Sequence, residues 1–105
     1  MPKRGDKLLI DDIIENIANI LEFTSGKSYE EFVADKMRVL AVIRCCEVIG
    51  EASNFISEEL KLKYPLVEWR MMSDSGIFLF TIISALTMKC FGRLFRKTFL
   101  ITMNY

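Results

Sequence analysis

The sequence predicts an all-α protein, an up-and-down bundle of about four helices that forms a single domain over residues 1–105. Apolar residues recur at spacings of three and four along the first half of the chain, and no segment shows the alternation of a half-buried strand. Of the 105 residues, 51% are hydrophobic. This is enough to bury one core and too little to build two domains.

The first predicted helix begins near Asp6, whose side chain can cap it, and ends near the loop sequence TSGK. Asp11, Asp12 and Glu15 occupy one side of this segment, and apolar residues return every three or four positions on the other. The predicted buried stripe consists of Leu9, Ile10, Ile13, Ile14, Ile17, Ile20 and Leu21.

Two further helices follow along the chain. Ser28 and Glu31 have the spacing of a capping box, which predicts a short helix in SYEEFVAD with Tyr29, Phe32 and Val33 on its apolar side. A third helix is expected over residues 37–63, about 40 Å long, and it stops at KYP because the residue before proline is pushed out of the α region. Its predicted buried stripe consists of Val42, Cys45, Cys46, Ile49, Ala52, Phe55, Ile56 and Leu60.

The chain changes character after Asp74, because the run from Ser75 to Met88 carries no charged residue. One interpretation is a buried fourth helix that packs on the apolar stripes of the others. Another is a membrane anchor followed by the basic flank KCFGRLFRK. A spanning helix needs about 20 apolar residues, so the shorter run favours the buried helix and no membrane contact. Trp69, just before this run, is expected to be a packing anchor.

Composition limits the chemistry. The 14 basic and 14 acidic residues cancel, so the chain has no overall positive field for nucleic acid. It has no histidine, the commonest general base and metal ligand, and we therefore expect neither a metal site nor a cofactor. Cys45, Cys46 and Cys90 are odd in number, and no secretory signal is expected ahead of the first helix. These features predict a reduced, cytoplasmic protein in which the adjacent pair fills the core.

Polar residues at helical spacing mark the opposite side of the third helix. Arg44, Glu47, Gly50 and Glu51 lie together there. Such a row is most often a solvated face with weak ion pairs. The functional interpretation is a groove that binds a partner, and Gly50 supports it because glycine inside a helix costs about 1 kcal/mol relative to alanine. These four residues are the candidates for a partner or groove site.

Three segments carry a resemblance to a known family. They are AVIRCCEVIGEA (Ala41–Ala52), SEEL (Ser57–Leu60) and YPLVEWR (Tyr64–Arg70). In this order and spacing, and over about residues 4–72, the chain resembles the HepT toxins of the HEPN superfamily. Residues 1–74 are thus similar to the family, and residues 75–105 form an aberrant C-terminal segment.

The resemblance implies a HEPN-like helical bundle that forms a homodimer. It also implies a metal-independent endoribonuclease toxin that acts on RNA and is neutralised by a minimal nucleotidyltransferase antitoxin, which transfers AMP to a tyrosine of the toxin. The family's catalytic motif is an arginine, four residues, a histidine, one residue and a tyrosine, soon after the tryptophan. Here SDSGIFLFTIISAL occupies that place and contains none of the three. No catalytic residue can therefore be assigned to this chain.

The genetic code suggests why the motif is missing. Suppose that the gene is read one nucleotide earlier from about Ser75. A Ser75 codon that ends in A, joined to the GG of Gly76, then gives arginine, and a Phe80 codon that ends in C, joined to the AC of Thr81, gives histidine. The two isoleucines that follow allow tyrosine, and the permitted translation is RNFLIHDYF, with the motif at its spacing. We therefore interpret the tail as a frameshifted translation, from a damaged gene or from a sequencing error.

Two hypotheses about function remain open. In the first, the protein is an endoribonuclease toxin by resemblance, and the present chain is inactive because it lacks the Arg-x4-His-x-Tyr motif. In the second, it is a non-catalytic helical module that binds a nucleotidyltransferase partner. The family supports the first, and the residues of this chain support the second.

Overall fold

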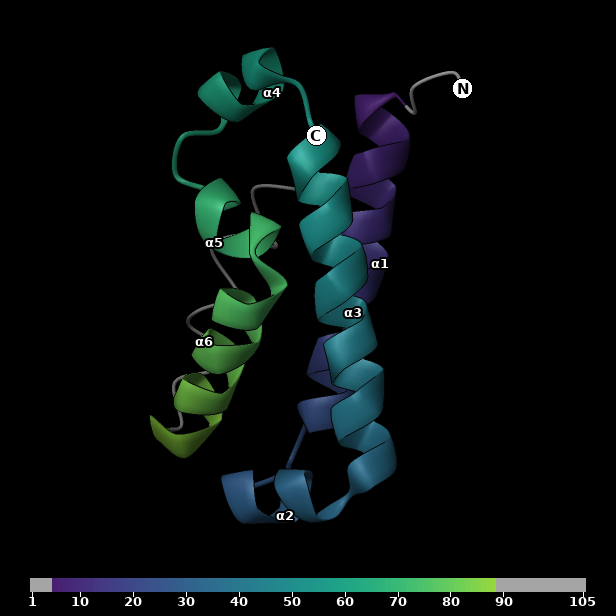
Figure 1. The fold of residues 1–105 in the computed structure, drawn as a ribbon, viewed down its shortest axis with the longest axis vertical. Coiled ribbons are helices and arrows are strands. Elements are labelled where there is room, and N and C mark those ends of the chain that lie inside the picture. The colour runs from purple at the N-terminus through teal and green to yellow at the C-terminus, as the bar shows by residue number, and fades with distance from the viewer. Residues whose placement is uncertain (1–4, 89–105) are drawn as a thin grey trace.

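The computed structural model describes residues 5–88 and confirms the all-α class, because this part of the chain forms six helices and no strand. Three long helices, α1, α3 and α6, run alternately down and up, and three short ones connect or flank them (Figure 1). The helices are α1 (Asp6–Thr24), α2 (Tyr29–Ala34), α3 (Lys36–Phe55), α4 (Glu58–Lys63), α5 (Trp69–Ser73) and α6 (Ser75–Met88).

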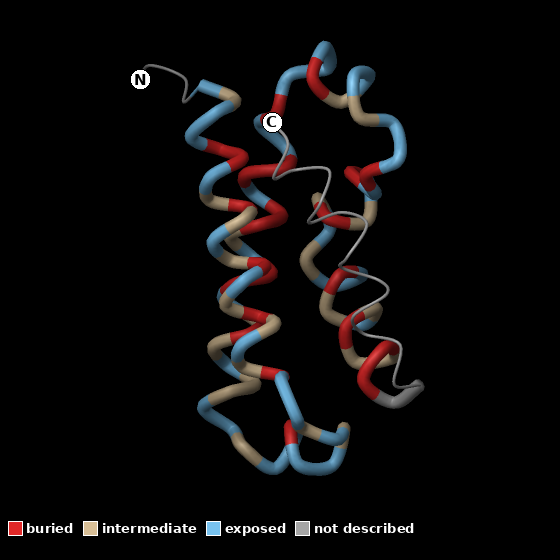
Figure 2. Tube along the Cα trace, turned by 180° about the vertical axis from the view of Figure 1, so that it is seen from behind, coloured by how far each residue is buried: buried red, intermediate tan, exposed pale blue. Residues whose placement is uncertain are grey.

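Helix α1 forms where the apolar spacing predicts it and packs along α3. Ile13, Ile17 and Ile20 are fully buried, and buried positions recur along the inner sides of the long helices (Figure 2). The predicted cap is wrong: the N-cap is Gly5, which makes no side-chain capping bond, and Asp6 is the first helical residue. The carboxylate of Asp6 bonds elsewhere in the bundle.

The short helix α2 begins with the predicted capping box. Ser28 Oγ accepts a hydrogen bond from the Glu31 N–H at 3.2 Å, and Glu31 Oε1 accepts one from the Ser28 N–H at 3.1 Å. This exchange satisfies two of the backbone donors that a helix start leaves without partners. The fixed start directs Phe32 into the core, where it is fully buried.

The expected helix over residues 37–63 is wrong in one respect, because the structure divides it into α3 and α4. Ile56 adopts an extended backbone with ψ 139° and ends α3. Ser57 then caps α4, since its Oγ accepts from the Leu60 N–H at 3.2 Å. Asp6 Oδ1 and Oδ2 hold the break by accepting from the Ser57 N–H at 3.1 Å and from its Oγ–H at 2.6 Å. Helix α3 is consequently about 30 Å long rather than 40 Å.

The predicted stripe of α3 is buried with one exception. Val42, Cys46 and Ile49 have almost no exposed surface, whereas the side chain of Phe55 is 68% exposed. The prediction that Phe55 lies in the core is wrong. Phe55 is the last residue of α3, where the chain turns away toward Ser57.

The α5–α6 region packs as predicted for a buried fourth helix. Trp69 is the expected anchor, since its ring is buried and its Nε1–H donates to the carbonyl oxygen of Tyr64 at 3.0 Å. Asp74 Oδ1 accepts hydrogen bonds from the backbone N–H groups of Gly76 and Ile77, in the first turn of α6, at 3.0 and 3.1 Å. Phe78 and Ile82 enter the core, and α6 contacts α3, α5 and α2. No helix within residues 5–88 combines the length and apolar character that crossing a membrane requires.

Gly50 lets the backbone of the α5–α6 region approach α3. A Cβ placed on Gly50 would lie 3.4 Å from the carbonyl oxygens of Met72 and Ser73 and 3.6 Å from the Ser75 nitrogen. These are ordinary contact distances, so a methyl group fits and a larger side chain does not. The close partner that the sequence suggests for Gly50 is thus a segment of the same chain.

Substitutions at Gly50 should show that the free energy of unfolding tolerates a methyl group there and not a larger side chain. Gly50→Ala should leave the free energy of unfolding unchanged or raise it by up to about 1 kcal/mol, because alanine is the better helix former. Gly50→Leu should lower it by about 1–3 kcal/mol, since the added carbons must displace backbone. Urea denaturation followed by circular dichroism would measure both, with Glu47→Leu as the exposed control. Equal stability of the Gly50→Leu and control variants would contradict the close approach.

Candidate functional site

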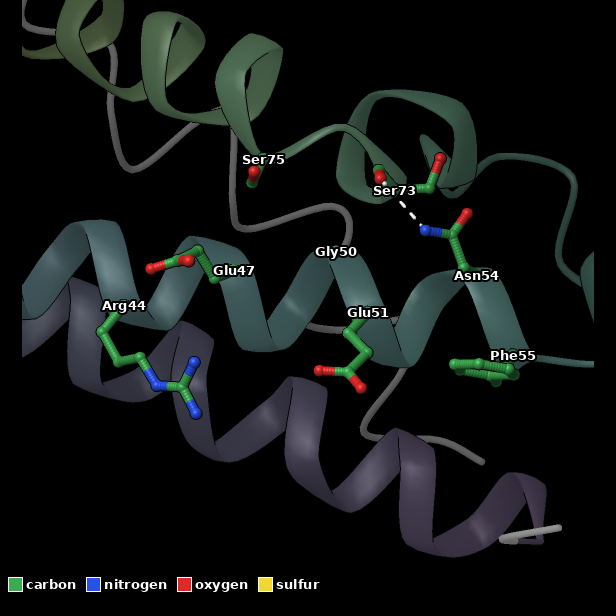
Figure 3. Close-up of a pocket in the computed structure, with 8 residues that line it drawn as sticks. All are labelled: Arg44, Glu47, Gly50, Glu51, Asn54, Phe55, Ser73 and Ser75. Carbon is green, nitrogen blue, oxygen red and sulfur yellow. Dashed lines mark hydrogen bonds between the residues drawn. The ribbon is translucent and has the colours of Figure 1, made fainter.

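The candidate site is an open polar groove between α3 and the α5–α6 junction, with a volume of about 440 Å³. Helix α3 supplies one wall, and two serines from α5 and α6 supply the other (Figure 3). The lining residues are Arg44, Glu47, Gly50, Glu51, Asn54, Phe55, Ser73 and Ser75.

All four residues that the sequence singles out lie at this groove. Arg44, Glu47 and Glu51 are exposed on α3, and Gly50 forms the floor against the α5–α6 backbone. The structure thus brings them together, and their role in binding a partner stays a prediction.

Sequence reasoning missed the second wall. Ser73 and Ser75 belong to a different element, and no periodic pattern connects them to α3. Asn54 joins the two walls, since its Nδ2–H donates to the Ser73 carbonyl oxygen at 3.4 Å. The only early sign was Gly50, because an interior helical glycine indicates that some backbone comes close.

The charged side chains of the groove form no ion pairs with one another. Within the described part of the chain the ion pairs lie elsewhere, and none joins Arg44, Glu47 or Glu51 to another side chain. One guanidinium and two carboxylates therefore face solvent at the same surface. Such a surface can form charge-assisted hydrogen bonds with a partner that supplies the complementary groups.

The groove offers no histidine for proton transfer, because the chain contains none. Helix α6 begins with Ser75 and Gly76 and contains no arginine between Ser75 and Met88. Arg93 and Arg96 lie outside the described residues. The groove therefore has polar and charged groups that can bind a partner, and it has no histidine for acid/base catalysis.

The two adjacent cysteines belong to the core, as predicted, and not to the groove. Burial raises the pKa of the Cys45 thiol. Burial, and to a lesser extent the neighbouring Cys45 and Glu47, raise the pKa of the Cys46 thiol to about 12. Both thiols therefore stay protonated at neutral pH and are poor nucleophiles. Among residues 5–88, no three cysteine or carboxylate side chains are grouped as metal ligands would be.

Comparison with known proteins identifies a family and several sequence relatives. Residues 13–75 match the family described as Ribonuclease HepT-like. A Methanocaldococcus jannaschii protein named "Putative RNase MJ1380" is 43% identical over 72 residues, which cover 69% of this chain and 66% of that protein. A Thermococcus cleftensis protein named "Probable ribonuclease HepT" is 44% identical over 71 residues, which cover 68% of this chain and 64% of that protein. No solved structure matches the chain.

The fold and the groove thus define an all-α helical domain with a polar groove between α3 and the α5–α6 junction. The chain belongs to the HepT-like ribonuclease family. It spans just under two thirds of the length of the two curated relatives named above. The family match ends at Ser75, the first residue of α6, so the rest of this uncharged helix lies outside the match.

The buried state of the α3 cysteines can be tested by their reactivity. A Cys90→Ser variant leaves only Cys45 and Cys46. At pH 8, Ellman's reagent should react with both thiols in denaturant and with neither in the native protein. The folded state also holds the Cys46 proton to a higher pH than the unfolded chain does. The free energy of unfolding should therefore fall as pH rises from about 9 toward 12. Fast reaction of both native thiols would contradict the packing of α3.

Proposed function

We propose that this protein is a HepT-type endoribonuclease toxin whose catalytic segment is missing from the present chain. The observation that carries the proposal is the family match over residues 13–75, which runs from α1 through α5. Relatives with more than 40% identity carry names that describe them as ribonucleases. RNA is accordingly the proposed substrate class, and the reaction is metal-independent phosphodiester cleavage.

The missing segment would supply the three catalytic roles. In the family pattern the arginine stabilises charge on the scissile phosphate, the histidine takes part in proton transfer, and the tyrosine is the residue that the antitoxin modifies with AMP. Reading the gene one nucleotide earlier permits an arginine at the codons of Ser75 and Gly76 and a histidine at those of Phe80 and Thr81. Ser75 lines the groove, so the restored arginine would enter beside Glu47 and Gly50.

Restoring the frame should restore activity. The present chain should not arrest growth or cleave RNA, because loss of positioned acid/base catalysis alone costs about 10²-fold to 10⁴-fold in rate. The restored-frame chain should do both. A matched control is the restored chain with its new histidine replaced by alanine, which should be as inactive as the present chain. Equal activity of the present and restored chains would show that function does not reside in this segment.

The second candidate is a non-catalytic module that binds a minimal nucleotidyltransferase antitoxin. It is favoured by the complete absence of histidine together with a groove whose α3 wall lies entirely inside the family-like part of the chain. The proposed contact is the side of the groove near Glu47, Gly50 and Ser73, where polar groups of α3 and α5 meet.

Co-expression with a cognate nucleotidyltransferase tests this module. The present chain should co-purify with it, and Glu47→Lys should weaken the complex by about ten-fold or more if the groove is the contact. Glu15→Lys, an exposed reversal on α1, is the matched control and should have no effect. If the nucleotidyltransferase bound the restored-frame chain and not the present chain, the proposal that the present chain is a binding module would be wrong.

A further inference from the structure

One side of the groove combines an exposed aromatic ring with a carboxylate. Phe55 is 68% exposed at the end of α3, and Glu51 lies one helical turn before it, so the two side chains are neighbours on the helix surface. Both line the groove (Figure 3). The exposed ring offers an apolar face on which a flat ligand can stack, and the carboxylate stands beside that face to accept hydrogen bonds.

The charged groups on this side of the groove are available to a ligand. No hydrogen bond or ion pair within residues 5–88 involves the guanidinium of Arg44 or the carboxylate of Glu51. Seven residues, or about 10 Å along the helix axis, separate the two. Figure 3 shows both side chains extending from the same side of α3, whereas Asn54 points toward Ser73. A ligand on this side would therefore meet the ring, the carboxylate and the guanidinium in that order.

The carboxylate selects among the bases of RNA. It offers two acceptor oxygens side by side and no donor. Guanine alone presents two adjacent donors, N1–H and an N2 amino hydrogen, on its Watson–Crick edge. Adenine and cytosine present one amino donor beside an acceptor nitrogen, and the N3–H of uracil lies between two carbonyl oxygens. Single-stranded RNA leaves these edges free, and its bases stack on aromatic side chains. The ring of Phe55 and the carboxylate of Glu51 therefore match the face and the edge of guanine.

We propose that this side of the groove recognises an unpaired guanine base of a single-stranded RNA. Phe55 stacks on the base, Glu51 accepts from its N1–H and N2 amino groups, and Arg44 binds a phosphate of the same strand. The inference rests on the proposed function, because it names the part of the RNA substrate that the groove contacts. It uses residues other than Glu47, Gly50 and Ser73, near which the antitoxin contact is proposed.

The affinity should come mainly from the base and little from the phosphates. Arg44 is the one cationic side chain that lines the described groove, and Glu47 and Glu51 add two negative charges. With a single phosphate contact, the logarithm of the binding constant should fall with the logarithm of the salt concentration at a slope of about −0.7. A surface that held RNA through many phosphates would give a slope several times steeper.

Fluorescence anisotropy with the full-length chain tests the base preference. The probe is a labelled single-stranded hexaribonucleotide with uridine at every position but one, where guanosine, inosine, adenosine, cytidine or uridine is placed. The guanosine probe should bind about ten-fold or more tighter than the adenosine, cytidine and uridine probes. Inosine should lose most of this advantage, because it lacks the N2 amino group. The present chain is expected not to cleave RNA, so binding can be measured without turnover.

Substitutions separate the roles of the ring and the carboxylate. Glu51→Gln should abolish the preference for guanosine and favour adenosine and cytidine, because glutamine offers one acceptor and one donor. Phe55→Ala should weaken the guanosine and inosine probes alike, by about ten-fold, because stacking is tolerant of sequence. The matched controls are Glu15→Gln on α1 and Phe80→Ala on α6, which change an exposed carboxylate and an exposed ring outside the groove. Neither should alter binding.

Three results of these titrations would overturn the inference: no binding of RNA, equal affinity for guanosine and inosine probes, or an unchanged preference in the Glu51→Gln variant. GMP bound as tightly as the guanosine probe would also overturn it, because the ligand would then be a free nucleotide. The cleavage test of the restored-frame chain stands apart. Cleavage by that chain without a guanosine preference in the present chain would refute only this inference. Guanosine-selective binding without cleavage by the restored-frame chain would refute only the proposed function.

Discussion

The packing of α3 against every other long element is the constraint on which the structure depends. Its buried side lies on α1, and its remaining contacts go to α2, α5 and α6. Gly50 keeps the contact with the α5–α6 region close, because a side chain larger than a methyl group would displace the backbone at Met72 and Ser73. The same close approach creates the groove, since the α5–α6 junction becomes its second wall. A single glycine therefore links the core of the bundle to its candidate site.

Local patterns could be predicted from the sequence, and contacts between distant segments could not. The apolar period places α1 and the buried side of α3, and the capping box places the start of α2, because these features involve residues within two turns of one another. The break between α3 and α4 at Ser57 is held by Asp6, which is 51 positions away in the sequence. No local sequence pattern predicts a contact over that distance. In the groove, the residues on α3 could be found by helical spacing. Ser73 could not, because it reaches Asn54 only through the fold.

Helix α6 shows how a segment can pack without belonging to the family pattern. It carries apolar residues on more than one side: Phe78 and Ile82 are buried, while Ile77 and Phe80 are 53% and 71% exposed. The hydrophobic effect is non-directional, so such a helix can cover the open side of α3 without a matched interface. A helix selected for this position would direct its polar residues outward. The mismatch agrees with the proposal that α6 is the out-of-frame product of a gene that encodes a catalytic helix.

The most direct test of this account is the nucleotide sequence that encodes residues 70–90. The frameshift proposal requires Phe80 to be encoded by TTC, because only a final C joined to the AC of Thr81 gives histidine. It also requires Ile82 to be encoded by ATT, which gives tyrosine with the next codon, and Ser75 by a codon that ends in A or C, which gives arginine with the GG of Gly76. If these codons are found, the family's catalytic motif lies intact in the neighbouring frame. A TTT codon at Phe80 would contradict the account, because it would place tyrosine where the histidine must be.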